Sequence, residues 1–177
     1  GFGASVKPAI SYSIELFTSL LHDFIESREE AIPWTVAGNS IGGLACLRLA
    51  QKVPESVDSV VLFNCAGGMS GFRYSDVPIL VKPILFVIQN VILKGPIGPY
   101  FFQNFRSRAN VESILKKQGV YGSTENVNEE LLEILLKPAD DEGACDVFLR
   151  VFGGPPGPTP ESILSSLHCP ILVFWGT

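Results

Sequence analysis

The chain has 177 residues, which is enough for one ordinary domain with a hydrophobic core. Its 46% hydrophobic and 18% charged residues predict an ordered, globular protein. The net charge of −5, without a run of Lys or Arg, argues against a nucleic-acid-binding surface.

The first predicted element is a helix. Residues 12–27 carry apolar side chains at helical spacing, and Ser11 or Ser13 can cap the first turn. The expected buried face of this helix consists of Phe17, Leu20, Leu21, Phe24 and Ile25.

Strands and helices then alternate. Residues 33–37 predict a short strand, and residues 41–53 predict a helix rich in Ala and Leu that stops at Pro54. Continuous apolar runs at 57–64 and 171–175 predict two further strands of the buried, parallel kind. This order predicts an α/β fold, with a parallel sheet and helices on both faces.

About a hundred residues of helical character separate the second predicted strand from the third. A loop at 67–71 precedes them, and a stiff proline-rich connector at 155–160 leads back to the sheet. Helices are expected at 77–93, 109–118, 131–136 (capped within 126–129) and 141–152. We therefore predict a core region at 1–66, a helical lid at 67–160 and a return to the core sheet at 161–177.

The most apolar stretch of the chain, residues 77–93, contains Lys82, Pro83, Gln89 and Asn90. It is also shorter than the ~20 residues that a membrane-spanning helix needs. The stretch therefore predicts an apolar, partly exposed helix pair in place of a span. Peripheral association with a membrane stays open at this point, as does the oligomeric state.

The four cysteines are Cys46, Cys65, Cys145 and Cys169, and no two of them share a CxxC spacing. We expect them to be small buried apolar side chains in a reducing compartment, not disulfides or zinc ligands. We also expect the chain to be an internal piece of a longer protein. It begins in a glycine-rich turn and ends at the tip of a predicted strand.

The most specific motif runs from a predicted strand into a helix and reads Gly38-Asn39-Ser40-Ile41-Gly42-Gly43. A GxSxG sequence in this context is typical of a nucleophile elbow, a sharp turn that presents a serine hydroxyl to a base and an oxyanion hole. Gly38 and Gly42 are expected to be small because the turn brings their backbones together, and Gly43 because the helix packs on the sheet there. Ser40 is the predicted nucleophile.

Ser40 would lie at the N-terminus of the 41–53 helix, where the helix dipole favours negative charge. The backbone N–H of Ile41 is the predicted oxyanion donor, and losing such a donor typically costs about 3 kcal/mol of transition-state stabilisation. The alternative is an ordinary glycine-rich turn in which Ser40 only caps the helix.

Neither histidine suits the role of the base. His22 lies in the body of the first helix and is expected to be half-exposed. His168 precedes the third strand at the amino edge of the sheet, whereas active sites of parallel sheets lie at the carboxyl edge. Strand length then places His168 roughly 15 Å or more from Ser40.

The chain resembles the α/β-hydrolase family along its length. The resembling segments are Gly1-Phe2-Gly3-Ala4-Ser5, the Gly38–Gly43 elbow, and the strand Cys169–Gly176 that precedes the acid in that family. More narrowly, it is similar to the plant and algal chloroplast group that contains pheophytinase and chlorophyll dephytylase. The segments that carry this similarity are Lys7–Ser13, the Gly-Asn-Ser elbow, Leu62–Gly68 and Gly153–Pro158.

The resemblance implies hydrolysis of a carboxylic ester by a Ser–His–Asp triad, without a metal or other cofactor. For the narrower group it implies a small lipophilic substrate, the phytyl ester of a chlorophyll-type pigment, and a location in the chloroplast. The apolar segments 84–88 and 100–102 fit a wall for such a substrate and equally fit packing of the lid on the sheet.

Only Ser40 of the implied triad lies in the chain. Some enzymes of this family carry the acid after the strand that follows the nucleophile, but Asn64 stands there, and Asp58 is at the wrong end of that strand. The turn at 140–142 is acidic and expected to be solvated. The acid is expected within a few residues after Thr177 and the histidine after the next strand, so the chain alone is expected to be inactive.

Two other functions remain open. The same elbow can support another hydrolytic reaction, such as carbon–carbon bond cleavage. Epoxide hydrolases and dehalogenases of this family normally use Asp as the nucleophile, so Ser40 counts against those reactions. The third possibility is a non-catalytic protein that keeps the hydrolase fold as a binding surface.

Overall fold

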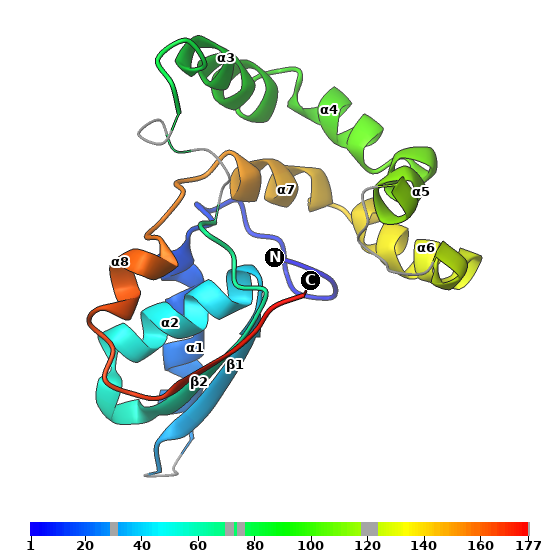
Figure 1. Ribbon diagram of the computed structural model, residues 1–177. Helices are drawn as coiled ribbons and strands as arrows, with labels where there is room; N and C mark the ends of the chain where they lie inside the picture. Colours follow the sequence, from blue (N-terminus) through cyan, green and yellow to red (C-terminus); the bar gives the residue numbers. More distant parts are fainter. Residues whose placement is uncertain (29–31, 70–72, 74–76, 118–123, 177) are drawn as a thin grey trace. The chain divides into compact units, whose positions relative to one another are not determined.

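Figure 1 shows the computed structural model of the chain, which describes residues 1–28, 32–69, 73, 77–117 and 124–176. The chain forms two compact units. The sheet unit consists of Tyr12–Ser75 and Gly154–Thr177, and the helical unit consists of Gly1–Ser11 and Asp76–Gly153.

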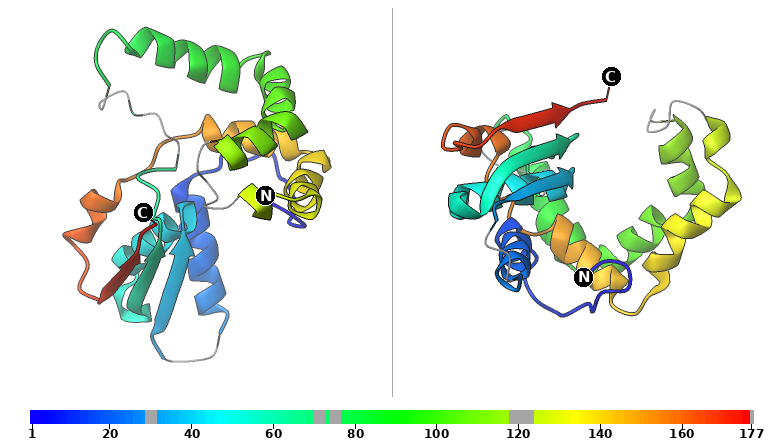
Figure 2. Two further views of the ribbon diagram at one scale, coloured as in Figure 1. Left: turned by 45° about the vertical axis from the view of Figure 1, so that its right-hand side comes forward. Right: turned by 90° about the horizontal axis from the view of Figure 1, so that it is seen from below.

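The sheet unit is built on three parallel strands in the order β1-β2-β3 (Figure 2). They are β1 (Trp34–Asn39), β2 (Val57–Phe63) and β3 (Ile171–Phe174). In the register of the sheet, Asn39 pairs with Phe63 and Phe63 pairs with Phe174, so the carboxyl ends of the strands meet at one edge. The predicted parallel sheet is confirmed, with strand ends that differ by one or two residues from those expected.

Helices of the sheet unit form a layer beside the strands (Figures 1 and 2). They are α1 (Ile14–Glu26), α2 (Ile41–Lys52), the 3-10 turn η1 (Pro54–Ser56) and α8 (Pro160–Leu164). α2 packs on β1 and β2, and α1 and α8 pack against α2. The core lies between α2 and the strands, where Leu44, Leu47, Leu49 and Val60 are completely buried. Among the described residues, Leu172 and Phe174 of β3 stay about half exposed.

The buried face of α1 differs from the predicted one. Ser13 does cap the helix, as expected, but the residues that are buried are Ile14 and Thr18, each 1% exposed. Leu20 and Phe24, which were expected inside, are 56% and 48% exposed. Sequence periodicity identifies the most apolar stripe of a helix, whereas the side of α1 that is buried depends on where α2 lies.

The helical unit has no strand among its described residues. It contains α3 (Lys82–Val87), the π-helical segment η2 (Ile88–Leu93), α4 (Gly98–Phe105), α5 (Arg108–Lys117), η3 (Thr124–Asn126), α6 (Glu129–Leu136), η4 (Lys137–Asp140) and α7 (Ala144–Phe152). α6 begins at its predicted cap, where Asn128 Oδ1 accepts the Leu131 N–H at 2.9 Å. The sequence missed α4 because Gly98 and Pro99 indicate a break, although proline is well tolerated in a first helical turn.

Aromatic side chains form the core of the helical unit. The Phe148 ring of α7 lies 5.2 Å from Phe102, 5.0 Å from Phe105 and 4.5 Å from Phe152, between ring centroids. α4 approaches α7 closely at Gly98, where an added Cβ would lie 2.7 Å from a methyl carbon of Leu149. A second small core, within α5, α6 and the turn before α6, contains Leu115, Val127 and Leu132.

The N-terminal segment Gly1–Ser11 groups with the helical unit and not with the sheet, which differs from the predicted core region over residues 1–66. Lys7 holds this segment in place. Its Nζ donates to Gly3 O at 2.8 Å and pairs with Asp141 Oδ2 at 3.0 Å, and its side chain is only 12% exposed. The acidic turn at 140–142 is exposed, as expected, and it also forms ion pairs, Asp141 with Lys7 and Asp140 with Arg106.

Among the described residues, no individual helix is both long and apolar enough to cross a membrane. The segments Lys82–Leu93 and Gly98–Phe105 meet this requirement only when taken together, and they are bent by 89° relative to each other.

Candidate active site

Ser40 lies between the end of β1 and the start of α2, in a backbone conformation that non-glycine residues seldom adopt. Its φ is 53° and its ψ is −120°. A conformation of this kind costs of order 1–3 kcal/mol and persists only where the surroundings hold it. The surroundings do hold it: the Ser40 N–H donates to Phe63 O at 3.1 Å, and the Ser40 carbonyl accepts the Ala66 N–H at 3.1 Å. The turn is thus fastened on both sides of the serine, to the last residue of β2 and to the loop that follows it.

The geometry separates the two interpretations of the motif. A helix-capping serine has an extended backbone and accepts an N–H of the first turn with its side chain. Ser40 has a positive φ, and its side chain makes no capping hydrogen bond to α2. Its side chain is exposed at the carboxyl edge of the sheet. The turn therefore has the geometry of a nucleophile elbow and not that of an ordinary cap.

The glycines of the elbow are not equivalent. A Cβ on Gly38 would lie 2.4 Å from the carbonyl carbon and oxygen of Gly42, so no side chain fits there. A Cβ on Gly43 would lie 3.1 Å from Gly38 O and 3.3 Å from Cys65 Sγ, as expected for a helix packed on the sheet. A Cβ on Gly42, however, would meet nothing within 4 Å among the described residues. The expectation that residue 42 must be small is therefore wrong: the turn brings its backbone against Gly38, but its own Cβ would point into open space.

The two other elbow residues lie where the motif predicts. Asn39 is the last residue of β1 and is exposed, and Ile41 is the first residue of α2. The N–H groups of a first helical turn have no partner within the helix, and the helix dipole adds a positive potential at that end. The Ile41 N–H therefore has the chemistry of an oxyanion donor beside the Ser40 hydroxyl.

Asn64 joins the end of β2 to the end of β3, a role that the sequence did not reveal. It follows β2 with a left-handed φ of 44°. Its N–H donates to Phe174 O at 3.0 Å, and its Oδ1 accepts the Gly176 N–H at 2.8 Å. Asn tolerates the left-handed region better than most residues. An Asn directly after an apolar strand is the one sequence signal that could have indicated this turn.

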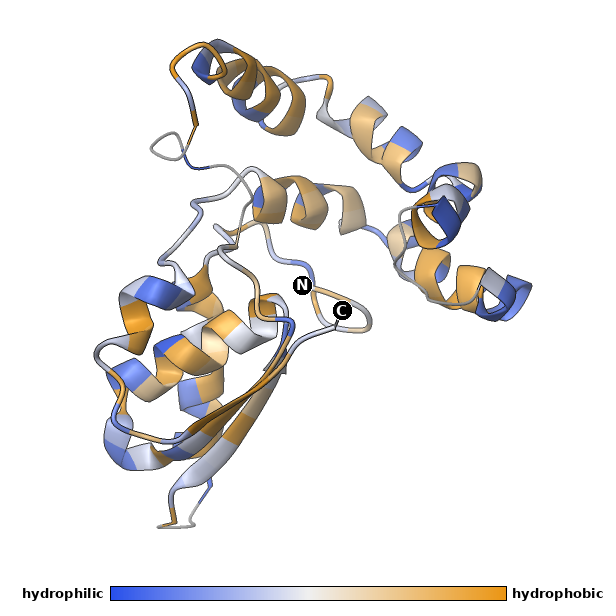
Figure 3. Cartoon of the chain, in the orientation of Figure 1, coloured by the Kyte–Doolittle hydropathy of each residue, from blue (hydrophilic) through white to orange (hydrophobic). Residues whose placement is uncertain are grey.

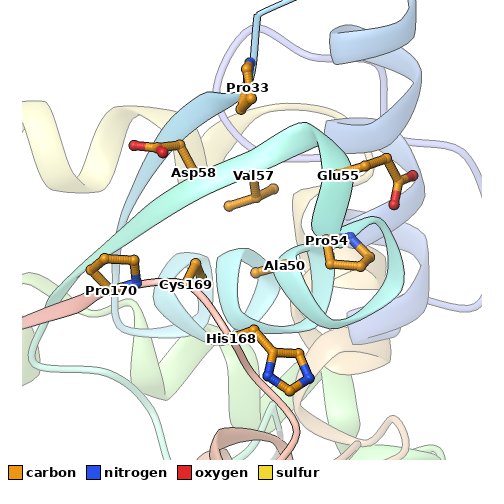
Figure 4. Close-up of a pocket in the computed structure, with 9 residues that line it drawn as sticks. All are labelled: Pro33, Ala50, Pro54, Glu55, Val57, Asp58, His168, Cys169 and Pro170. Carbon is orange, nitrogen blue, oxygen red and sulfur yellow. The ribbon is translucent and has the colours of Figure 1, made fainter.

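Both histidines lie away from the elbow edge. His168 lines a cleft of about 350 Å³ with Val57 and Asp58, the first residues of β2, which places it at the amino edge of the sheet (Figure 4). Figure 4 shows that its imidazole and the Asp58 carboxylate do not point toward each other. His22 lies on α1 with its side chain 39% exposed, and its Nε2 is 3.8 Å from Glu26 Oε1. In the part of the chain that the structure describes, no three His, Cys, Asp or Glu side chains are grouped to hold a metal ion.

Two of the four free cysteines are buried, as predicted, and both belong to the sheet unit. Burial raises the pKa of the Cys46 thiol to about 11, with a smaller contribution from Cys65. Burial also raises the pKa of Cys65, whose Sγ lies under α2 at Gly43. Cys145 and Cys169 are partly exposed, which corrects the expectation that all four are buried.

Sequence comparison finds relatives among hydrolases, while no protein-family model matches the chain. Lipase 1 of Psychrobacter immobilis is 32% identical, over 99% of this chain and 50% of the lipase. Lipase 3 of Moraxella sp. (strain TA144) is 23% identical, over 99% of this chain and 51% of the lipase. The 2-hydroxy-6-oxo-6-(2'-aminophenyl)hexa-2,4-dienoic acid hydrolase of Metapseudomonas resinovorans is 36% identical over 67 residues, 38% of this chain and 23% of that protein. The chain thus spans about half the length of the two lipases.

Structural comparison extends over the whole chain. The epoxide hydrolase CorEH superposes with a TM-score of 0.71 at 14% identity. The superposition covers 100% of this chain and 62% of the CorEH chain. The serine hydrolase CarC, involved in carbazole degradation, gives 0.62 at 19% identity, with coverage of 99% and 56%. A putative lipase from Acinetobacter baumannii gives 0.56 at 19% identity, with coverage of 98% and 54%. These neighbours and the parallel sheet identify the fold of this chain as part of an α/β-hydrolase fold.

Proposed function

We propose that the protein is a serine hydrolase that cleaves carboxylic esters, with Ser40 as its nucleophile. The observation that carries this proposal is the elbow, in which a strained serine is bonded to Phe63 of β2 and to Ala66 in the loop after β2, and is presented at the carboxyl edge of the sheet. Strain of this kind is retained where the surrounding structure holds it for a purpose. The lipases that resemble the chain in sequence support the ester-hydrolase assignment.

The proposed reaction has two stages. Ser40 Oγ attacks the ester carbonyl carbon while a base takes the hydroxyl proton, and the carbonyl oxygen becomes an oxyanion that accepts the Ile41 N–H. The base returns its proton to the leaving alcohol, and water then cleaves the acyl-enzyme by the same route. His22 and His168 lie in places unsuited to act as this base. The proposal therefore assigns the base and its acid partner to residues outside these 177.

The proposed substrate is a lipophilic ester. Two relatives are named lipases, and the helical unit exposes large apolar side chains such as Leu80, Ile84 and Tyr100. The narrowest form of the proposal is the phytyl ester of a chlorophyll-type pigment, in a chloroplast. It is supported by the sequence similarity of Lys7–Ser13, Leu62–Gly68 and Gly153–Pro158 to the pheophytinase group.

The test uses the protein expressed from its full natural coding sequence, treated with a fluorophosphonate probe. We expect the probe to label Ser40, and we expect Ser40→Ala to abolish labelling and lower kcat by about 10⁴-fold or more. The same coding sequence should contain an Asp soon after Thr177 and a His after the next strand. A protein that has those residues and leaves Ser40 unlabelled would be a non-catalytic member of this fold.

Substrate assays then test the finer statements separately. Short-chain esters, long-chain esters and phytyl pigment esters are compared by kcat/KM, with a dienoic acid of the kind named for the Metapseudomonas relative as a further substrate. A preference for long chains supports a lipophilic substrate, and a preference for the pigment ester supports the narrow form. Turnover of the dienoic acid in place of the esters would replace ester cleavage with another reaction at the same serine.

A further inference from the structure

α3 and η2 form the first helical stretch of the helical unit. In a normal surface helix the apolar side is buried, whereas here large apolar side chains lie on the exposed side. Across α3 and η2, the buried stripe repeats every four residues and consists of Leu85, Gln89 and Leu93, so it includes a polar side chain. The exposed side is mostly apolar and includes one polar side chain, Asn90, whose Nδ2 donates to Phe86 O at 2.9 Å. Its large side chains are Ile84 (60% exposed), Phe86 (58%), Val87 (48%) and Val91 (38%). Exposed apolar surface of this density marks an interaction site.

The apolar surface continues on both sides of α3 and η2. Ile79 and Leu80, just before α3, are 78% and 86% exposed, and Tyr100 of α4 is 72% exposed. Figure 3 shows α3 and the turns of η2 as one of the most continuously hydrophobic parts of the chain. We call residues 77–105 the α3–α4 segment.

The charged residues within this stretch of sequence are all positive. Residues 77–111 contain four Lys and Arg and no Asp or Glu, whereas the rest of the chain contains nine Lys and Arg and eighteen Asp and Glu. Arg106 and Arg108 are used in ion pairs with Asp140 and Glu129. Lys82 and Lys94 stand at the two ends of the α3–η2 helix, and neither has an ion-pair partner among the described residues.

The shape of the segment excludes a simple span and fits an interfacial position. Its two helical parts are long and apolar enough for a membrane span only together, and the 89° bend between them prevents one straight crossing. A helix that lies in a lipid interface has an apolar face in the acyl region, cations at its polar margin, and aromatic rings such as that of Tyr100 at headgroup level. Lysines at both ends of an apolar face match the anionic headgroups that border the acyl region of a membrane.

We propose that the α3–α4 segment docks the protein on an anionic lipid surface, with Ile84, Phe86 and Val87 in the acyl boundary and Lys82 and Lys94 on the headgroups. The docking is independent of the reaction proposed for Ser40. It would explain why the most apolar face of the chain is exposed and why the acidic residues of an acidic protein are absent from this segment.

The test measures binding of the full-length protein to sedimented vesicles of phosphatidylcholine with and without 30% phosphatidylserine. The double variant Ile84→Gln/Val87→Gln should bind anionic vesicles about tenfold or more weakly, since burial of apolar side chains drives interfacial binding. Lys82→Gln/Lys94→Gln should lose about 25-fold on anionic vesicles and little on neutral ones, because each lysine near an anionic surface contributes roughly a factor of five. Added salt should reduce the binding of the wild-type protein to anionic vesicles.

The matched control is Ile134→Gln/Leu135→Gln on α6, where the same kinds of side chain are 61% and 45% exposed. This control should bind like the wild type, and so should Ser40→Ala, even if the protein proves to have no esterase activity. Equal losses of vesicle binding in the α3 and α6 variants would overturn the proposal, because they would indicate non-specific binding through any exposed apolar side chain. A wild-type protein that does not bind vesicles would overturn lipid docking and assign the apolar face to contact with the remainder of the protein. An α3 variant that alters only the oligomeric mass in sedimentation would assign the face to a second copy of the chain.

Discussion

Two apolar helices of this chain, α2 and α3, lie in different surroundings. α2 buries seven of its twelve residues, whereas α3, which is the more apolar helix, buries only Leu85 of its six. α2 lies on a parallel sheet whose side chains meet it along its length, and Leu44 and Leu47 are completely buried. α3 continues directly into η2 and has no sheet to cover it among the described residues of its unit. Burial therefore follows from the partner that the fold supplies and not from the hydropathy of the helix.

The comparison separates two kinds of apolar residue. In the sheet unit they form a core around the elbow, where a substitution should affect folding and chemistry together. On the exposed face of α3 they are available for an external surface, where a substitution should affect binding and leave folding almost unchanged. The predictions below test this division, starting from the largest expected effect.

The largest effect is expected at Gly38. Gly38→Ala places a Cβ 2.4 Å from the Gly42 backbone, so the elbow must open, at a cost of about 4 kcal/mol or more. Its matched control is Gly42→Ala, which meets no atom and replaces a helical glycine, so it should stabilise by up to about 1 kcal/mol. Urea denaturation measures both, and fluorophosphonate labelling reports whether the elbow survives. Equal losses in the two variants would show that the close approach at Gly38 is absent in the protein.

The second prediction compares the two helices directly. Leu47→Ala in α2 removes a completely buried side chain and should lower the free energy of unfolding by about 3 kcal/mol. Ile84→Ala in α3 removes a side chain that is 60% exposed and should change it by about 0.5 kcal/mol or less. The same denaturation experiment measures both variants. A large loss for Ile84→Ala would mean that the α3 face is covered in the folded protein, which would also count against lipid docking.

Local patterns predicted the parts of the fold whose partners are near in sequence or repeat regularly. The three strands and α2 follow from continuous apolar runs bounded by turn residues. Ser40 follows from a glycine-spaced motif between a strand and a helix. The caps at Ser13 and Asn128 are local as well, because a cap bonds to an N–H three residues away.

Long-range contacts account for what the sequence did not predict. The ion pair between Lys7 and Asp141 joins residues 134 positions apart, and nothing local in either neighbourhood indicates it. The hydrogen bond between Asn64 and Gly176 spans 112 positions. The prediction that residue 42 must be small is wrong for a related reason. The motif indicates which backbones lie close together, but not the direction in which a Cβ would point.

The third prediction concerns the turn at Asn64. Asn64→Gly keeps the left-handed backbone accessible and loses the bond to the Gly176 N–H, which should cost about 1 kcal/mol. Asn64→Ala loses the same bond and adds strain at a φ of 44°, for a total cost of about 2 kcal/mol. Denaturation in urea separates the two terms. If Ala and Gly were equally destabilising, the left-handed turn would not be part of the folded state.

The smallest expected effect is a pH dependence in the core of the sheet unit. Burial holds the pKa of Cys46 at about 11, above the ordinary value of 9.0 that the unfolded chain has. The unfolded state therefore releases its proton first as the pH rises. The contribution of Cys46 to stability is complete below about pH 9 and declines between about pH 9 and pH 11.

At about pH 10 the loss should be on the order of 1 kcal/mol. Cys46→Ala should show a shallower decline than the wild type between about pH 9 and pH 11. Burial also raises the pKa of the partly exposed Cys145, but less, so Cys145→Ala should change the decline less than Cys46→Ala does. Parallel curves for wild type and Cys46→Ala would show that the thiol is hydrated and that the layer under the elbow is looser than the burial of Leu44 and Leu47 indicates.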